Sequence, residues 1–506
     1  MSEKFFDDNE LPLEGDDELG LDGPAVEVDP GAAVPEVRSG GGRERPEEEV
    51  PPELRARYAE VVDAILARTP EHLPEPTLHR VARVMELMGD PQRAFPVIHL
   101  TGTNGKTSTT RFIERLLREM GLRTGRFTSP HLHDMRERIA LDGEPIGIES
   151  FLATYDDVIP FVEMVDAESM ADEDPQRHVR MTYFEVVVCL AYAAFADAPV
   201  DVAVVEVGLG GVWDATSVAD GVVSVVTPVA IDHVRLLGSS LEEIATEKSG
   251  IIKDGALTVA AVQEPEVMQI LVDRADEVGA DLRAEGLSFG VLSREVAVGG
   301  QQVSVRGLTG DYPDLFLPLF GAHQAHNAAL AIAAVEAFVG GGEQPIDTEV
   351  LQAGLAGVSS PGRLEIVRRS PTVVVDAAHN PAGVAALAAA LEESFTFTRL
   401  VGLLAVLEDK DAESMVQELE TVLDHVVVTR TTSPRAIRPH RLGELCTEYF
   451  GQDRVTVVQD LPEALDVAAG LADDSSSGGG VAGAVLATGS ITTAAEVRAL
   501  LGVTTT

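Results

Sequence analysis

The sequence predicts an α/β protein with two successive domains, each organised around a mainly parallel sheet. Short apolar runs of strand length alternate with amphipathic or alanine-rich stretches of helical length, a pattern typical of parallel strands joined by helices. The glycine-rich segment 339–345 interrupts this alternation, and a second α/β series follows it. A chain of 506 residues has room for two or three domains of ordinary size.

Three regions are expected along the chain. Residues 1–50 hold 16 acidic and 4 basic residues and many Gly and Pro, so we expect an acidic disordered tail. Residues 51–340 are expected to form an N-terminal domain with strands near 95–100, 201–208 and 221–229. Residues 345–506 are expected to form a C-terminal α/β domain, whose strand-like runs lie at 372–377, 399–406, 425–431, 454–460 and 483–489.

Composition and charge exclude several classes of protein. Hydrophobic residues make up 45% and charged residues 24% of the chain, as in globular proteins. The 83 acidic and 38 basic residues give a net charge of −45, which excludes a general nucleic-acid binder. No apolar stretch reaches membrane-spanning length, the first residues lack a signal-peptide pattern, and two cysteines make no disulfide scaffold. We therefore expect a soluble, cytoplasmic protein that binds neither nucleic acid nor membrane.

The segment Gly102–Thr107 (GTNGKT) is a candidate phosphate-binding loop. It follows an apolar run at 95–100 and precedes an amphipathic stretch that Gly121 should end. Backbone N–H groups of such a turn and of the helix start converge on an anion. Lys106 would contact the β- and γ-phosphates, and the Thr107 hydroxyl could reach Mg²⁺. Leu100 stands where a strict P-loop has glycine, so this loop is a shortened variant.

Lysine is scarce, which draws attention to the lysines that remain. Only five of the 38 basic residues are lysine. A lysine can titrate and react where an arginine cannot, so the lysines that fall inside motifs are candidates for chemistry. These are Lys106, Lys248 and Lys410.

Three further segments carry candidate Mg²⁺ ligands, since this ion takes oxygen ligands and keeps several waters. They are 128–132, 182–185 and 231–233. Glu206 and the turn Gly208–Gly211 lie at the carboxyl end of another expected strand, where ligands bind in open parallel sheets. The spacing of these glycines does not fit a dinucleotide-binding fingerprint.

Taken together, the motifs closely resemble the folylpolyglutamate synthase/dihydrofolate synthase family, within the Mur ligase superfamily. The resemblance covers roughly residues 95–490, with its motifs in family order. The matching stretches are 102–109, 123–132, 181–185, 204–217, 231–238, 244–253, 321–331, 361–365, 376–381, 407–411 and 487–490. It implies a P-loop ATPase domain of Mur ligase type followed by a Rossmann-like ligase domain.

The resemblance also implies roles for individual residues. Lys106, Lys248 and His379 would take part in catalysis, with Lys248 carbamylated to N6-carboxylysine, and Ser490 would bind the incoming glutamate together with His379. Mg²⁺ would be held by Ser129, Glu185 and His233. ATP would be held by Gly102, Thr103, Asn104, Gly105, Lys106, Thr107, Asn327, Arg363 and Asp376.

The activity implied is ATP-dependent ligation of L-glutamate to a folate or dihydropteroate carboxylate through an acyl phosphate, with ADP and phosphate as the other products. The resemblance leaves open which of these acceptors is used, and it implies a monomer. Departures from the family pattern are Val212, Trp213, Ser217, Ser249 and Ala377, none of which removes a candidate ligand.

Two alternative functions stay open at this point. One is a different Mur-type amino-acid ligase; those enzymes usually carry an extra N-terminal domain, for which few residues precede the loop at 102. The other is a catalytically inactive nucleotide-binding protein, which would be expected to lack the charged groups listed above.

Overall fold

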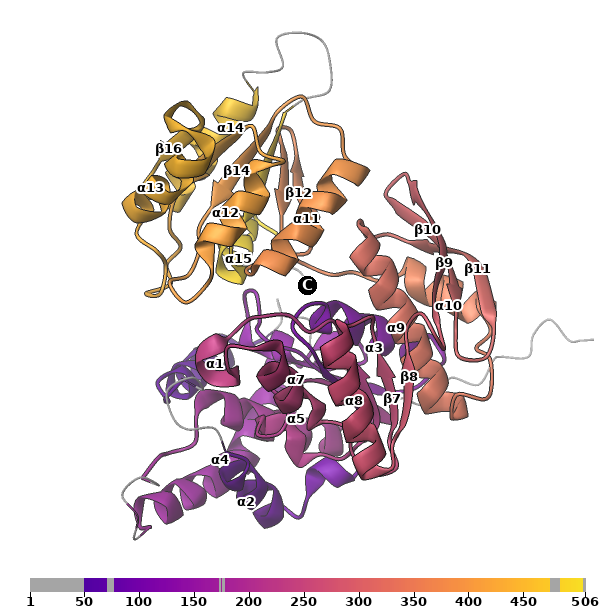
Figure 1. The fold of residues 1–506 in the computed structure, drawn as a ribbon. Coiled ribbons are helices and arrows are strands. Elements are labelled where there is room, and N and C mark those ends of the chain that lie inside the picture. Colours follow the sequence, from indigo (N-terminus) through magenta and orange to yellow (C-terminus); the bar gives the residue numbers. More distant parts are fainter. Residues whose placement is uncertain (1–49, 71–76, 173, 175–177, 474–482, 504–506) are drawn as a thin grey trace, which may run out of the picture. The chain divides into compact units, whose positions relative to one another are not determined.

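A computed structural model describes residues 50–70, 77–172, 174, 178–473 and 483–503. The tail expected at 1–50 therefore lies, except for Val50, outside the described residues. Figure 1 shows two sheets flanked by helices, one in the N-terminal two thirds of the chain and one in the orange-to-yellow C-terminal part. This confirms the predicted α/β class.

The N-terminal sheet has eight strands in the order β4-β3-β2-β5-β1-β6-β7-β8. The six strands β2, β5, β1, β6, β7 and β8 pair in parallel with their neighbours in this order. At the edge next to β2, the strands β3 and β4 pair antiparallel. The strands are β1 Val97–Thr101, β2 Thr124–Phe127, β3 Ile139–Leu141, β4 Glu144–Pro145, β5 Val202–Glu206, β6 Gly221–Val226, β7 Leu257–Ala260 and β8 Asp281–Ala284.

Helices cover both faces of this sheet, which explains the continuous apolar runs in its strands. Side chains alternate between the faces, so Ile98 and Leu100 pack with α3 and α9 while Val97 packs with α5. The helices are α1 Pro52–Leu66, α2 His79–Leu87, α3 Lys106–Glu119, α4 Ile148–Met170, α5 Tyr183–Asp197, α6 Val234–Leu237, α7 Leu241–Ser249, α8 Pro265–Val278 and α9 Ala322–Gly340.

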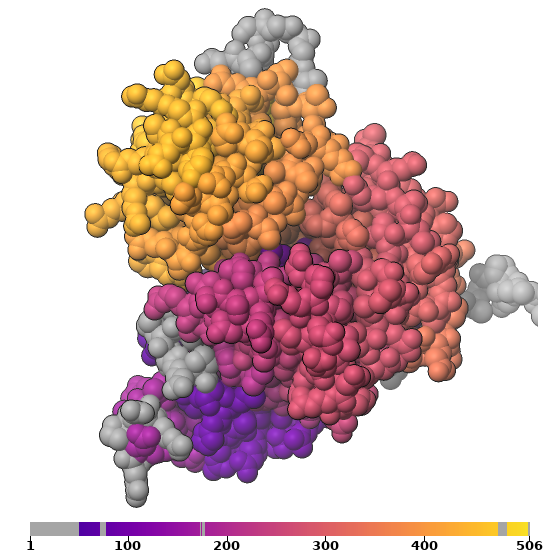
Figure 2. Space-filling model, in the orientation of Figure 1, coloured from indigo at the N-terminus to yellow at the C-terminus, as the bar shows by residue number. Residues whose placement is uncertain are grey.

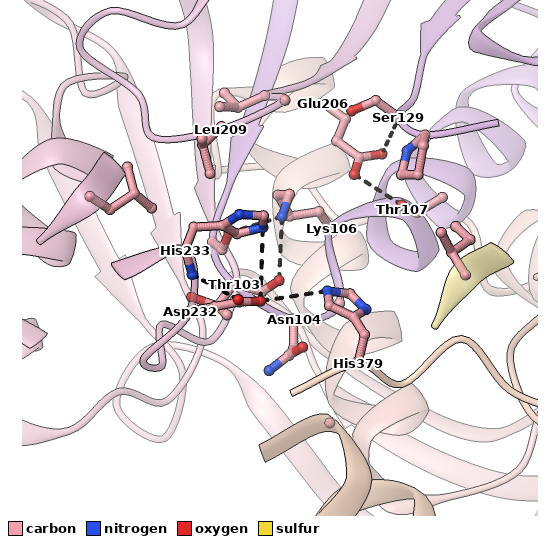
Figure 3. A pocket seen from close by; sticks show the side chains of 18 of the residues that line it. Thr103, Asn104, Lys106, Thr107, Ser129, Glu206, Leu209, Asp232, His233 and His379 are labelled. Carbon is pink, nitrogen blue, oxygen red and sulfur yellow. Dashed lines mark hydrogen bonds and ion pairs between the residues drawn. The ribbon is translucent and has the colours of Figure 1, made fainter. Parts of the chain in front are cut away.

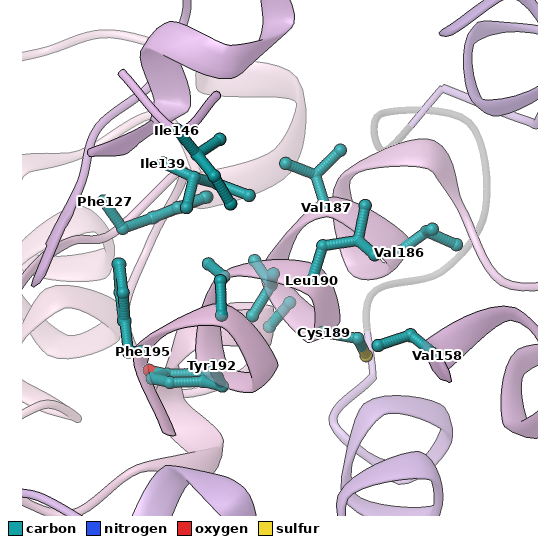
Figure 4. Close-up of a cluster of buried hydrophobic side chains, with 14 of the residues drawn as sticks. Phe127, Ile139, Ile146, Val158, Val186, Val187, Cys189, Leu190, Tyr192 and Phe195 are labelled. Atoms are coloured by element: carbon teal, nitrogen blue, oxygen red, sulfur yellow. The ribbon is translucent and has the colours of Figure 1, made fainter. Parts of the chain in front are cut away.

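Helix α5 is apolar around almost its whole circumference because it is buried between the sheet and other helices. Val186, Val187 and Leu190 are each at most 1% exposed and belong to one core with Phe127 of β2 (Figure 4). Burying such a side chain stabilises the fold by about 1.5–3 kcal/mol. This core holds the sheet edge and the start of α5 in fixed positions next to the site described below.

A small antiparallel sheet, not predicted from the sequence, follows the eight-stranded one. It contains β9 Gly290–Ala297, β10 Gly300–Arg306 and β11 Asp311–Leu317, in the order β11-β10-β9. Its inward side chains Val303 and Leu315 belong to the same core as α3 and α9.

Helix α10 (Thr348–Ala356) begins after the expected linker at 339–345 but packs on the N-terminal side of it. Leu351 and Leu355 are fully buried in the core that includes α3 and α9. The next core begins with Leu364. We therefore propose that the domains meet near residues 357–363 rather than at 340–345.

The C-terminal sheet has the order β12-β13-β17-β14-β15-β16, with β12 antiparallel and the other strands parallel. All five expected strands are present, and β12 is additional. Its strands are β12 Glu365–Arg369, β13 Thr372–Val375, β14 Leu400–Leu404, β15 His425–Val428, β16 Val455–Val457 and β17 Ala484–Thr488.

Two buried cores lie on the two faces of this sheet. One includes side chains of α11, α12 and α13, and the other includes side chains of α14 and α15. These helices are α11 Pro381–Ser394, α12 Ala412–Glu420, α13 Pro439–Phe450, α14 Leu461–Asp473 and α15 Ile491–Leu500. Within the ranges that the structure describes, no helix is long and apolar enough to cross a membrane.

Candidate active site

A cavity of about 1180 Å³ is lined by residues from both domains. Many of the N-terminal residues come from loops that follow β1, β2, β5, β6, β7 and β8, and many of the C-terminal ones from loops that follow β13, β14, β15 and β17. Others come from helices, among them α5, α7, α9 and α11. In parallel sheets this edge is where ligands bind. In Figure 2 a furrow separates the orange-to-yellow segments from the magenta ones.

The predicted phosphate loop runs from the end of β1 to the start of α3. Gly105 has φ +87°, and a Cβ there would lie 2.6 Å from Oδ1 of Asn327. Gly102 has φ +142°, and its Cβ would lie 1.9 Å from Oγ1 of Thr227. Both positions therefore require glycine. Helix α3 begins at Lys106 directly after this turn, so its first N–H groups can bind an anion.

Lys106 and Lys248 converge on one carbonyl group of this loop. The oxygen of Gly102 accepts hydrogen bonds from Nζ of Lys106 at 3.0 Å and from Nζ of Lys248 at 2.8 Å. Burial lowers the pKa of both amines. For Lys248, burial and the nearby Lys106 charge lower the pKa to about 7. A part of the Lys248 amines is therefore neutral and nucleophilic near neutral pH.

Glu206 joins the phosphate loop to Ser129. Its carboxylate accepts a hydrogen bond from the Thr107 hydroxyl at 2.9 Å and one from the backbone N–H of Ser129 at 3.4 Å (Figure 3). Burial raises the pKa of this carboxyl group, which the Lys106 charge opposes. The Thr107 hydroxyl and the Glu206 carboxylate thus lie together beside Ser129, and oxygen donors of this kind suit Mg²⁺.

Glu185, the acid that the sequence suggested for Mg²⁺, lines the cavity and has hydrogen-bond partners of its own. Its carboxylate accepts hydrogen bonds from Nε of Arg80 at 3.1 and 3.2 Å, and one from the backbone N–H of Thr182 at 2.7 Å. It is the third residue of a capping box at the start of α5. Glu185 nevertheless lines the same cavity as Ser129, so it stays a candidate ligand, and Glu206 in that cavity is a second candidate acid. The position of Glu206 at the carboxyl end of β5 was the signal in the sequence.

His233, the third candidate ligand, follows Asp232 in the loop after β6. Its φ of +51° turns the chain into α6. The His233 side chain is 41% exposed, and partial burial together with the Lys410 charge lowers its pKa, which favours the neutral imidazole that can bind a metal. Among the described residues no three His, Cys, Asp or Glu side chains cluster as a metal site. A Mg²⁺ held here would depend on hydroxyls and water as well.

The C-terminal domain supplies the remaining predicted residues. Arg363, Asp376, His379 and Ser490 all line the cavity. The Asp376 carboxylate accepts hydrogen bonds from the N–H groups of Leu364 and Ala378, each at 2.8 Å, and burial raises its pKa. Ser490 caps α15 by accepting a hydrogen bond from the Thr493 N–H at 3.1 Å.

Part of the cavity wall is aromatic and aliphatic. Tyr183 and Phe184 from the start of α5, with Leu209 and Trp213 from the loop after β5, line it. A Cβ at Gly208 would lie only 2.3 Å from Cζ of the Phe184 ring, so the ring occupies the space beside this glycine. The cavity therefore combines the candidate phosphate loop with a region that suits planar apolar groups.

Comparison with known proteins gives consistent matches along the chain. The Mur ligase middle domain matches residues 100–335, and the Mur ligase glutamate ligase domain matches residues 362–490. A dihydrofolate synthase/folylpolyglutamate synthase from Mycobacterium tuberculosis is 47% identical over 464 residues, which cover 89% of this chain and 95% of the relative.

Two solved structures are similar throughout. A folylpolyglutamate synthase from Mycobacterium tuberculosis complexed with ADP has a TM-score of 0.85 at 46% identity, covering 90% of this chain and 100% of that one. A folylpolyglutamate synthase complex with AMPPCP and folate has a TM-score of 0.73 at 31% identity, covering 88% of this chain and 99% of that one.

Proposed function

Because the chain belongs to the dihydrofolate synthase/folylpolyglutamate synthase family of Mur ligases, we propose that it joins L-glutamate to a folate or dihydropteroate carboxylate using ATP. The observation that carries this proposal is the single cavity that holds the loop 102–107 from one domain and Arg363 and Asp376 from the other. Its aromatic part supports an acceptor with planar rings.

The phosphate loop would position ATP for transfer of its γ-phosphoryl group. Backbone N–H groups at the start of α3 and the Lys106 ammonium would bind the phosphates, and Asn327, Arg363 and Asp376 would hold the nucleoside. When bound, Mg²⁺ neutralises charge on the transferred group. Ser129, Glu185 and His233 are the residues that we propose would hold it, since all three line the cavity. Glu206, which is hydrogen-bonded to Thr107 and to the Ser129 N–H, is a further candidate.

The reaction would take place in two steps. The acceptor carboxylate first attacks the γ-phosphorus, giving an acyl phosphate and ADP, because a carboxylate is itself a poor acyl donor. The neutral amine of glutamate then attacks the acyl carbon, and phosphate leaves as the amide forms. His379 and Ser490 line the C-terminal side of the cavity, which supports a place for glutamate there.

We also propose that Lys248 is carbamylated. A neutral amine adds CO₂ and releases a proton, and the pKa of about 7 makes that form available near neutral pH. The carbamate would place a negative group beside Lys106 in a buried site. Cytoplasmic location and a monomeric state stay predictions.

The first experiment measures phosphate release with ATP and glutamate, comparing dihydropteroate with tetrahydrofolate as acceptor. We expect glutamate-dependent turnover with at least one of them. In Lys106→Ala, loss of the charge on the phosphates should lower kcat about 100-fold or more, with an unchanged circular dichroism spectrum. Turnover of wild-type size in the folded variant would contradict the assignment, and Lys253→Ala, outside the cavity lining, is the matched control.

A further inference from the structure

Asp232, in the loop after β6 of the N-terminal domain, contacts side chains of the C-terminal domain. Nζ of Lys410 lies 2.6 Å from its Oδ1, Nδ2 of Asn380 donates to Oδ2 at 3.0 Å, and Nε2 of His379 lies 3.5 Å from Oδ2. Figure 3 shows His379 and Asp232 facing each other across the cavity, with Lys106 close by. Lys410, Asn380 and His379 follow β14 and β13 of the C-terminal sheet.

Asn380 makes a second connection between the domains. Its amide exchanges two hydrogen bonds with the amide of Asn104, at 3.1 and 3.3 Å, and Asn104 belongs to the phosphate loop. The Asn380 Oδ1 also accepts the N–H of Gly383 at 2.8 Å and so caps α11. One side chain therefore joins the start of a C-terminal helix to the loop that would bind phosphate and to Asp232.

The ion pair between Asp232 and Lys410 is buried, with side-chain exposures of 7% and 6%. Removing one partner of a buried pair leaves an uncompensated charge, which is strongly unfavourable. While the domains stay in contact the two charges satisfy each other. When the domains separate each charge has to be solvated by water instead.

We propose that Asp232, Lys410 and Asn380 form a clamp that holds the two domains together over the phosphate loop during ligation. They act as positioning residues, since none of them needs to touch the reacting atoms. The proposal rests on the proposed function, because the clamp matters to a reaction with a water-sensitive intermediate.

The clamp decides which nucleophile reaches the acyl phosphate. In the productive step the glutamate amine forms the C–N bond, the C–O bond to phosphate breaks, and the amine loses a proton. If water enters, it forms a C–O bond to the same carbon instead, and the products are the original acid and phosphate. An open clamp should therefore separate phosphate release from amide formation.

The test compares two variants with a control. Lys410→Met removes the charge and keeps the length of the side chain. Asn380→Asp keeps a good helix cap. It replaces the amide nitrogen that donates to Oδ2 of Asp232 at 3.0 Å with a carboxylate oxygen, so that two carboxylates face each other. Lys253→Met changes a lysine outside the cavity lining. For each protein, released phosphate and amide product are measured with saturating glutamate, and the radius of gyration is measured by X-ray scattering.

We expect the ratio of phosphate to amide to rise about three-fold or more in both clamp variants, with a larger radius of gyration and an unchanged circular dichroism spectrum. In Lys253→Met both quantities should match the wild type. A folded Lys410→Met or Asn380→Asp with wild-type coupling and compactness would overturn the clamp. If the wild type itself shows no glutamate-dependent phosphate release, the proposed function fails instead.

A measurement on the wild type avoids any folding defect in the variants. Acetylation of lysines, followed by mass spectrometry, should modify Lys410 several-fold more slowly than the partly exposed Lys253. Equal rates would show that the pair with Asp232 is not formed in solution, which would also overturn the proposal.

Discussion

At the scale of single residues, the backbone geometry of the phosphate loop leads to a matched pair of variants. Gly105 and Gly121 have nearly the same φ, +87° and +84°, but only a Cβ at Gly105 meets another group, Oδ1 of Asn327 at 2.6 Å. Alanine in left-handed backbone costs about 1–2 kcal/mol at either site. We expect Gly105→Ala to raise KM for ATP about ten-fold and Gly121→Ala to leave it unchanged. Equal KM values in steady-state assays would disprove the proposed role of the loop.

Lys248 gives a second prediction at this scale, on pH and bicarbonate. Because its pKa is lowered to about 7, the neutral amine becomes the main form as pH rises through that value. Carbamylation, and with it activity, should therefore increase from pH about 6 to about 8 when bicarbonate is present. Lys248→Arg should lose activity because an arginine cannot add CO₂ in this way. NMR with isotope-labelled bicarbonate should show a carbamate signal in the wild type; no signal in an active sample would contradict the proposal.

At the scale of elements, α10 lies after the glycine-rich segment yet packs with the N-terminal core. Leu351→Ala should lower the free energy of unfolding of that domain by about 2–5 kcal/mol. Gln352→Ala, on the exposed side of the helix, should change this free energy by less than about 0.5 kcal/mol. The only tryptophan of the chain, Trp213, lies in the N-terminal domain, so its fluorescence during denaturation follows the unfolding of that domain. A Leu351→Ala transition that matched the wild type would place α10 with the other domain.

At the scale of the whole molecule, the two domains have separate cores but share one cavity. A nucleotide that contacts both domains should stabilise both of them against unfolding, by about 2.7 kcal/mol at a nucleotide concentration of 100 times its Kd. Calorimetry with AMPPCP should therefore move the unfolding of the C-terminal domain to higher temperature. Arg363→Ala should weaken this shift while leaving unfolding without nucleotide close to wild type, since no side-chain hydrogen bond joins Arg363 to another residue in the part of the chain that the structure describes. An unchanged shift would mean that the nucleotide does not contact Arg363.

The sequence by itself determined the features that depend on short stretches of chain. Strand-length apolar runs give the strands β1, β5, β6 and β13 to β17, because a buried strand needs only local composition. The loop Gly102–Thr107 could be recognised because its glycines, lysine and threonine act through neighbouring backbone atoms. The small sheet β9–β11 was missed because its strands mix polar with apolar residues and lack the continuous apolar runs of the two larger sheets.

Only the tertiary structure decided which distant side chains meet. Glu185 and Glu206 are both buried acids that the sequence places next to apolar runs, and the difference lies in their partners: Arg80 for one, Thr107 and Ser129 for the other. Lys410 had no assigned role until the fold placed it on Asp232, 178 residues away along the chain. Such pairings depend on how sheets and helices are arranged in space, and residue type and spacing along the chain do not encode that arrangement directly.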